Sequence, residues 1–147
     1  KMHRMLVKDI DERTGYKKLP NIVIGSKIKT IPPEKVYGAM DDLIKWYAHN
    51  NGKVHPIKLA AVFHGRFEQI HPFSDGNGRV GRFLINIILL KNKHPPLIIR
   101  KSQRISYLKA LENFDYNHMA TLERLLLKRF KETYKKFFEI YIDYVQI

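Results

Sequence analysis

The sequence predicts an all-α domain with a small β excursion near its start. Over most of the chain, apolar residues recur every three or four positions, which is the period of an amphipathic helix. Between about residues 15 and 33, glycine, proline and β-branched residues interrupt this period, and strand candidates occur only there. The 147 residues contain no internal repeat and no linker. We therefore expect a single domain over residues 1–147.

The first half of the chain predicts two long helices after a short N-terminal one. The first helix is expected over residues 2–12, on the spacing of Met2, Met5, Leu6 and Ile10. The run NIVIG and the closing pair Pro32-Pro33 then predict a short hairpin or an irregular loop. A helix follows from Glu34 to about Asn50, with one apolar face: Val36, Met40, Leu43, Ile44 and Tyr47. The next begins near Pro56, which suits a first helical turn.

The second half of the chain predicts three more helices. One carries an apolar face after residue 78, formed by Val80, Phe83, Leu84, Ile87 and Ile88, and HPP at residues 94–96 ends it. SQRISYLKALENF predicts another. The last is long and has a single apolar stripe: Met119, Leu122, Leu126, Phe130, Tyr134, Phe137 and Tyr141.

Composition narrows the class of protein. Lys and Arg number 27 against 14 Asp and Glu, a net charge of +13, which favours polyanionic partners such as nucleic acid or phosphorylated molecules. The absence of cysteine excludes disulfides and thiolate metal sites. No apolar run approaches the ~20 residues that cross a membrane, and the start has no signal-peptide core. We expect a soluble cytoplasmic protein, and a chain that begins inside a longer one.

The stretch HPFSDGNGRVGR, residues 71–82, concentrates polar chemistry directly before an apolar helix. Gly76, Asn77 and Gly78 tolerate positive φ, so their backbone N–H groups can converge at the helix N-terminus, where the helix dipole favours an anion. Arg79 and Arg82 are three positions apart and carry two guanidinium groups to the same side. This arrangement suits a chain of phosphates better than one carboxylate.

An acid and a base flank this predicted phosphate site. Asp75 would repel phosphates unless a cation intervened, and Mg²⁺ held by one carboxylate and phosphate oxygens is the usual solution. His71 is a histidine four residues before Asp75, and a histidine can act as a base near neutral pH. Together they describe attack by a hydroxyl on a nucleotide phosphate. Each residue alone also has an ordinary structural interpretation, as a turn, a buried histidine or a surface ion pair.

The whole stretch resembles the signature of the Fic family, His-x-Phe-x-Asp/Glu-Gly-Asn-Gly-Arg-x-x-Arg, at every specified position. KVYGAMDDLIKWY, HPIKLAAVFHGRFEQI, FLINIILL, HPPLIIR and RISYLKAL also resemble the surroundings of this motif in Fic domains. The resemblance implies an all-helical Fic fold, a helical bundle with a β-hairpin flap over about residues 20–33. It also implies transfer of AMP from ATP, with Mg²⁺, to a Ser, Thr or Tyr hydroxyl of a target protein.

The resemblance also implies a role for each residue of the motif. His71 resembles the general base, and Asp75 resembles the Mg²⁺ ligand. Gly76, Asn77 and Gly78 would line the anion hole around the α- and β-phosphates.

Other positions carry over in the same way. Arg79 would contact the β-phosphate and Arg82 the γ-phosphate, and Tyr107 matches a residue near the adenine. Four residues fall where the family places its flap, which holds an extended segment of the target and borders the nucleotide: Ile24, Gly25, Ser26 and Lys27.

Two comparisons with the family pattern refine this expectation. TIPPEK, residues 30–35, has the Thr and Glu spacing of the family's autoinhibitory helix, but its two prolines make it a loop. A regulatory helix would therefore lie upstream of Lys1 or on a partner. Gly78 is intact, whereas relatives that phosphorylate have a lysine there, and this favours AMP transfer.

Three alternatives follow from the same residues. The net charge would fit a nucleic-acid-binding module, or a basic patch that serves a nucleic-acid-binding region outside this chain. A Fic fold that uses another donor, such as a phosphocholine nucleotide, fits the signature equally. A metal hydrolase built on His64, His71 and Asp75 is set aside, since no third imidazole or thiolate is suitably placed.

Overall fold

The computed structural model describes residues 15–115 and 118–145, and every regular element in these ranges is helical. The predicted helix over residues 2–12 lies outside the described residues. The elements are the 3₁₀ helices η1 (Pro33–Lys35) and η2 (Lys101–Gln103) and the α-helices α2 (Val36–Asn50), α3 (Pro56–Ile70), α4 (Asn77–Lys91), α5 (Arg104–Asp115) and α6 (Met119–Val145). The five predicted helices over these ranges are thus confirmed.

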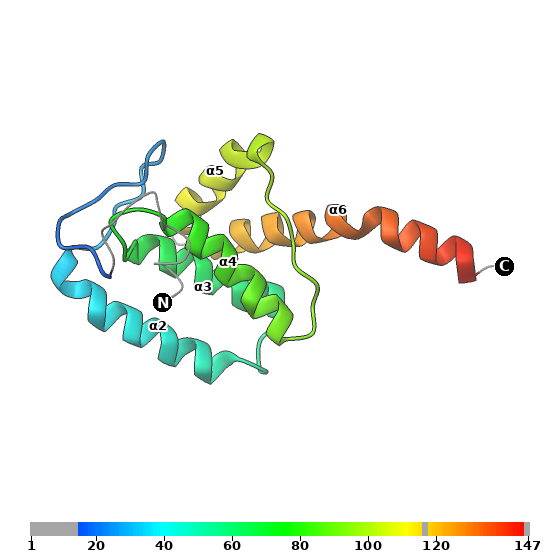
Figure 1. The fold of residues 1–147 in the computed structure, drawn as a ribbon, viewed down its shortest axis with the longest axis horizontal. Coiled ribbons are helices and arrows are strands. Elements are labelled where there is room, and N and C mark those ends of the chain that lie inside the picture. The colour runs from blue at the N-terminus through cyan, green and yellow to red at the C-terminus, as the bar shows by residue number, and fades with distance from the viewer. Residues whose placement is uncertain (1–14, 116–117, 146–147) are drawn as a thin grey trace.

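Helix α3 is the central element, and α2, α4, α5 and α6 all pack against it (Figure 1). A helix that is buried on nearly all sides must be apolar or small on nearly all sides. Most of α3 meets this condition through the run LAAVF and the small residue Gly65. A Cβ on Gly65 would stand 2.6 Å from the ring of Phe114, so glycine allows α5 to approach α3 closely.

Helix α4 begins at Asn77, earlier than predicted. The residue at its N-cap, Gly76, has a left-handed backbone conformation. Its buried face also differs from the prediction: Val80 and Ile88 are buried, whereas Phe83 is exposed. The run FLINIILL is apolar on almost every side, so its periodicity alone cannot define which side meets the core. The Asn86 side chain donates to the Leu97 carbonyl at 3.1 Å and accepts from the Leu97 N–H at 3.0 Å. These two hydrogen bonds hold the connection between α4 and η2.

The hairpin predicted for about residues 20–33 is absent, and the described residues there form an irregular loop (the blue segment of Figure 1). A two-stranded hairpin without other support is marginal in water. Here the Ser26 N–H donates to the Val23 carbonyl within the loop at 3.1 Å, and two other backbone N–H groups bond to helices. The Lys27 N–H donates to the Glu112 carboxylate at 3.0 Å, and the Ile31 N–H donates to the Gln69 carbonyl at 3.2 Å.

Helix α6 extends beyond the rest of the fold (Figure 1). Its predicted apolar stripe is buried only in the first half, at Leu122 and Leu126, where the helix packs on α3 and α5. Farther along, Phe137 is 62% exposed and Tyr141 56%. Over the described residues, no helix is both long and apolar enough to cross a bilayer.

Candidate functional site

His71 stands at the C-terminal end of α3 in a left-handed backbone conformation, with φ 47° and ψ 59°. A non-glycine residue in this region is disfavoured by about 1–2 kcal/mol. Two local features favour it here. Pro72 disfavours the right-handed helical region for the residue before it, and the His71 N–H donates to the Phe67 carbonyl at 2.8 Å. The imidazole is thereby turned back against α3, where it is 9% exposed.

Two residues from the N-terminal loop support this turn, and the sequence analysis did not identify either of them. Lys17 is buried, donating its backbone N–H to the Pro72 carbonyl at 2.8 Å and its ammonium to the Ile70 carbonyl at 3.2 Å. Burial lowers the pKa of Lys17. The Asn21 amide donates to the Phe73 carbonyl at 2.8 Å. Both contacts join segments about fifty residues apart, which no local pattern reveals.

The loop between α3 and α4 is closed by the side chain of Asn77. Its Oδ1 accepts from the Phe73 N–H at 2.8 Å, and its Nδ2 donates to the Phe73 carbonyl at 2.7 Å, so that the 1% exposed amide braces the loop from inside. Of the two glycines that were predicted to tolerate positive φ, Gly76 adopts it, at 79°, and Gly78 does not. Gly78 lies in the first turn of α4, and a Cβ there would stand 3.3 Å from the Arg82 guanidinium.

Asp75 and Arg79 form an ion pair with 3.1 Å between Oδ2 and Nη2. Both side chains are partly exposed at the mouth of the loop. Within the described ranges no group of three or more His, Asp or Glu side chains is placed to hold a metal ion. A cation at this loop would therefore be held by a single carboxylate together with ligand oxygens.

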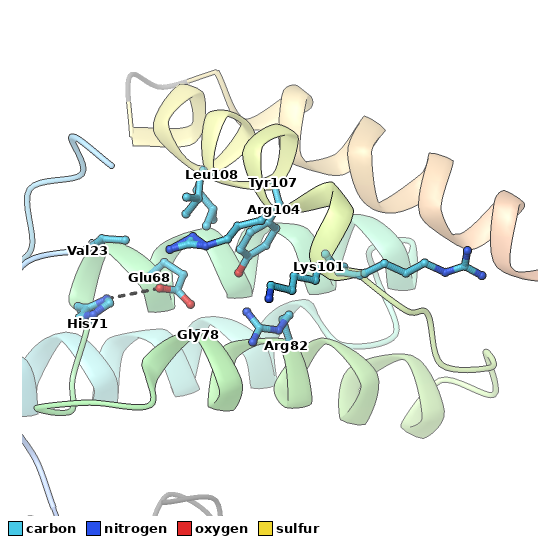
Figure 2. A pocket seen from close by; sticks show the side chains of 12 residues that line it. Val23, Glu68, His71, Gly78, Arg82, Lys101, Arg104, Tyr107 and Leu108 are labelled. Carbon is cyan, nitrogen blue, oxygen red and sulfur yellow. Dashed lines mark ion pairs between the residues drawn. The ribbon is translucent and has the colours of Figure 1, made fainter. Parts of the chain in front are cut away.

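Two cavities meet beside His71. The first, of about 330 Å³, is named the α5 cavity and is lined by Val23, Glu68, His71, Gly78, Arg82, Ile99, Arg100, Lys101, Arg104, Tyr107, Leu108 and Leu111 (Figure 2). The second, of about 310 Å³, is named the loop cavity and is lined by Ile22, Ile24, His71, Ser74, Asp75, Gly76, Asn77, Gly78, Arg79 and Arg82. Only His71, Gly78 and Arg82 line both. These three residues therefore form the junction.

A buried polar cluster lies at the inner wall of the α5 cavity. Nε2 of His64 lies 2.6 Å from the Tyr107 hydroxyl, which also bonds to the Arg82 guanidinium. Burial lowers the pKa of His64, and the Arg82 charge adds to this effect while Glu68 opposes it. Burial and the Glu68 charge raise the pKa of Tyr107. Near neutral pH the imidazole and the phenol are thus both uncharged.

The predicted flap residues face two directions. Ile24 lines the loop cavity, and its carbonyl accepts from the Arg104 guanidinium at 3.3 Å. Ser26 and Lys27 do not line this cavity but contact α5 farther along, because Glu112 Oε1 accepts from the Ser26 hydroxyl and from the Lys27 N–H, each at 3.0 Å. These two hydrogen bonds lower the pKa of Glu112, with the Lys27 bond contributing most.

The fold brings most of the predicted site residues together. Tyr107 lines the α5 cavity, and these predicted residues line the adjoining loop cavity: Ile24, His71, Asp75, Gly76, Asn77, Gly78, Arg79 and Arg82. Arg100, Lys101 and Arg104 also line the α5 cavity, and their charge in the run RKSQR is a signal that sequence reasoning passed over. A nucleoside-sized cavity with basic walls that opens onto a helix N-terminus can bind a phosphorylated ligand beside an imidazole.

Comparisons with known proteins show a family likeness. The sequence model of the Fic/DOC family matches residues 1–89. A probable protein adenylyltransferase of Aquifex aeolicus is 32% identical over 84% of this chain and 38% of its own length. The protein adenylyltransferase Fic of Drosophila melanogaster is 33% identical over 72% of this chain and 22% of its own length. The chain thus spans well under half the length of these relatives.

The fold is also found among solved structures. A Fic family protein from Desulfovibrio desulfuricans G20 superimposes with a TM-score of 0.79 at 26% identity. The match covers 94% of this chain and 45% of the other. The helical arrangement around α3 is therefore shared with that protein.

Proposed function

The chain belongs to the Fic/DOC family, and we propose that it is a protein adenylyltransferase that transfers AMP from ATP to a hydroxyl of a target protein. This proposal is supported by the names of the Aquifex and Drosophila relatives and by the geometry around His71. The single observation that carries the proposal is the junction of the two cavities at His71, Gly78 and Arg82. A nucleotide that spans both cavities would pass its phosphates in front of the imidazole.

In this proposal the α5 cavity receives the nucleoside and the loop cavity receives the phosphates. The volume of about 330 Å³ lies within the usual range of ligand pockets, and Tyr107 and Leu108 supply apolar surface. The N–H groups in the first turn of α4 have no acceptor inside the helix and carry the positive end of its dipole. Arg79 and Arg82 add two guanidinium groups, for the β- and γ-phosphates respectively.

Asp75 would hold Mg²⁺. It is the single carboxylate among the residues that line the loop cavity, and one carboxylate with phosphate oxygens is a donor set that Mg²⁺ accepts. When bound, Mg²⁺ would neutralise charge on the phosphates and on the pyrophosphate that leaves. The Arg79 guanidinium, now paired with Asp75 at 3.1 Å, would turn to the phosphates as the cation takes its place.

The chemistry assigned to His71 is the removal of one proton. The target hydroxyl gives its proton to the imidazole, its oxygen bonds to the α-phosphorus, and the bond from that phosphorus to the bridging oxygen of the β-phosphate breaks. The products are AMP-modified protein and pyrophosphate. The target segment would lie along the flap, where Ile22 and Ile24 expose their side chains beside the loop cavity.

Control of this site is assigned to a segment outside the chain. A regulatory helix, located upstream or on a partner, would place an acid on Arg82 and so displace the γ-phosphate. Arg82 is suited to this role because it lines both cavities.

The proposal is tested with ATP labelled at either end. The chain is incubated with a lysate, Mg²⁺ and ATP carrying ³²P in the α- or the γ-phosphate. We expect protein-bound label from α-labelled ATP only. Label from γ-labelled ATP would indicate phosphorylation instead. Competition by a phosphocholine nucleotide stronger than that by ATP would indicate another donor. The absence of any transfer, together with tight and salt-sensitive DNA binding, would favour the nucleic-acid-binding alternative.

A further inference from the structure

Glu68 is a buried acid that faces His71. Glu68 lies three residues before His71 on the last turn of α3 and is 2% exposed. Its Oε2 stands 3.4 Å from Nδ1 of His71 (Figure 2). Its other oxygen, Oε1, is buried and has no hydrogen-bond partner among the residues that the structure describes. A buried carboxylate is unfavourable unless a partner compensates for its lost hydration, so its place beside the imidazole needs an explanation.

The packing of α4 holds this carboxylate in place. A Cβ on Gly81 would stand 2.7 Å from Glu68 Oε1 and 2.5 Å from the His64 ring. The α4 backbone therefore presses directly on both side chains, and Glu68 has little room to move away from His71. Glycine at position 81 is what allows an acid and an imidazole to fit between the two helices.

Three other polar side chains near Glu68 make hydrogen bonds elsewhere, although Nδ1 of His64 makes none within the described residues. His64 shares a hydrogen bond with Tyr107 through Nε2, and Tyr107 bonds to Arg82. Arg104 also faces this space from α5, with its guanidinium on the Ile24 carbonyl at 3.3 Å. Within the described part of the chain, His64 and His71 each have a buried Nδ1 without a hydrogen bond. His71 is the ring that has the Glu68 carboxylate within ion-pair distance of its Nδ1.

We propose that Glu68 is a positioning residue for AMP transfer: it accepts the Nδ1–H of His71 and so leaves Nε2 unprotonated at the junction of the two cavities. This inference rests on the proposed function of His71. The nitrogen that is protonated in a neutral imidazole is set by the hydrogen bond that this nitrogen makes. A separation of 3.4 Å is long for that bond, and catalytic hydrogen bonds are often long before substrate binds and shorten afterwards.

The arrangement also suits the charge that develops during transfer. When Nε2 takes the proton of the target hydroxyl, the imidazole becomes a cation with N–H groups at both nitrogens. The Glu68 side chain then lies next to that positive charge. The proton stays on Nε2 until the ring releases it, and the carboxylate only orients and stabilises the ring.

The first test is spectroscopic and does not depend on activity. The ¹⁵N shifts of the His71 ring nitrogens are assigned by difference from His71→Gln. In the wild type near neutral pH we expect the Nδ1–H form. In Glu68→Gln we expect a measurable population of the Nε2–H form, whereas the exposed control Glu34→Gln leaves the ring signals unchanged. An Nε2–H ring in the wild type would overturn the proposal, whether or not Glu68→Gln folds.

The second test is a double-mutant cycle on transfer rates. Glu68→Gln keeps the shape of the side chain, and we expect kcat to fall on the order of 10²-fold with the KM for ATP unchanged. In a His71→Ala background the same substitution should have no further effect, because the two residues act as a unit. An equal loss in both backgrounds would overturn the proposal. If the wild type transfers no AMP, the proposed function fails and the ring tautomer alone decides the role of Glu68.

Discussion

The hydroxyl of Tyr107 lies 2.6 Å from Nε2 of His64, so α5 and α3 share a hydrogen bond inside the fold, next to Arg82. Tyr107→Phe removes this partner and leaves the buried imidazole nitrogen unsatisfied. We expect the free energy of unfolding to fall by about 1–3 kcal/mol, measured by urea denaturation. Tyr37→Phe is the matched control, since Tyr37 is 76% exposed, and its unfolding should be unchanged. Equal stability of the Tyr107 variant and the control would contradict the assigned bond.

Gly81 should be the least replaceable glycine of α4. A methyl group there would stand within 2.7 Å of the side chains of His64 and Glu68, both of which are buried. We expect Gly81→Ala to destabilise the protein by about 1–3 kcal/mol through overpacking and to lower AMP transfer as well. In Gly38→Ala, where a Cβ meets nothing within 4 Å, stability should rise by about 0.5–1 kcal/mol, as for alanine in an exposed helix. Thermal unfolding of the two variants gives the comparison.

Asn77 is predicted to act through the loop that it braces. In Asn77→Asp the shape is kept, but an oxygen replaces the Nδ2 that donates to the Phe73 carbonyl at 2.7 Å. Two acceptors then face each other in a buried place, and we expect a loss of about 1–3 kcal/mol in stability together with weaker ATP binding. Asn51→Asp is the control, because Asn51 is exposed and accepts through its Oδ1. A near-neutral Asn77→Asp would show that the loop does not depend on this amide.

The anchoring of the flap to α5 should depend on pH. The hydrogen bonds from Lys27 and Ser26 hold the pKa of Glu112 below its ordinary value of 4.5. A carboxyl with a lowered pKa in the folded state stabilises the protein above its unfolded pKa, and this contribution is lost as the pH falls through the lower folded value. We expect hydrogen exchange at the Lys27 amide, after correction for intrinsic rates, to accelerate below about pH 4.5. In Glu112→Gln this pH dependence should disappear; if it persists, another group controls the flap.

Much of the fold follows from local patterns, and the differences have identifiable causes. Helices with one apolar face were predictable from its period, as in α2, where Val36, Met40 and Leu43 are buried as predicted and Ile44 is exposed. The buried face of α4 was not predictable, since its sequence is apolar on almost every side. For residues 20–33 the sequence allowed a hairpin or an irregular loop, and the structure shows the loop and no hairpin. The backbone N–H groups of residues 27 and 31 bond to α5 and α3, and those partners lie far along the sequence.

The candidate site was predictable only where its chemistry is contiguous in sequence. The motif from His71 to Arg82 lies in one stretch, so its residue types and spacing were enough to place it. Lys17 and Asn21 contact the same loop, although they lie about fifty residues away from it in the sequence. Glu68 carries no signal of its own in the sequence, because it looks like an ordinary polar residue of a mostly buried helix. Its position against His71 depends on how closely α4 approaches at Gly81. That approach exists only in the folded chain.

The measurement that tests the central claim most directly compares His71→Ala with the wild type in two assays on the same preparation: ATP affinity by calorimetry, and protein-bound label from α-³²P-ATP. In the proposed mechanism the imidazole removes a proton, and the α4 N-terminus and its arginines bind the phosphates. We therefore expect the affinity for ATP to be unchanged in His71→Ala. We expect the rate of AMP transfer to fall on the order of 10²–10⁴-fold. Undiminished label in the His71→Ala protein would contradict the role of His71. A parallel loss of ATP binding would show that His71 serves to bind the nucleotide.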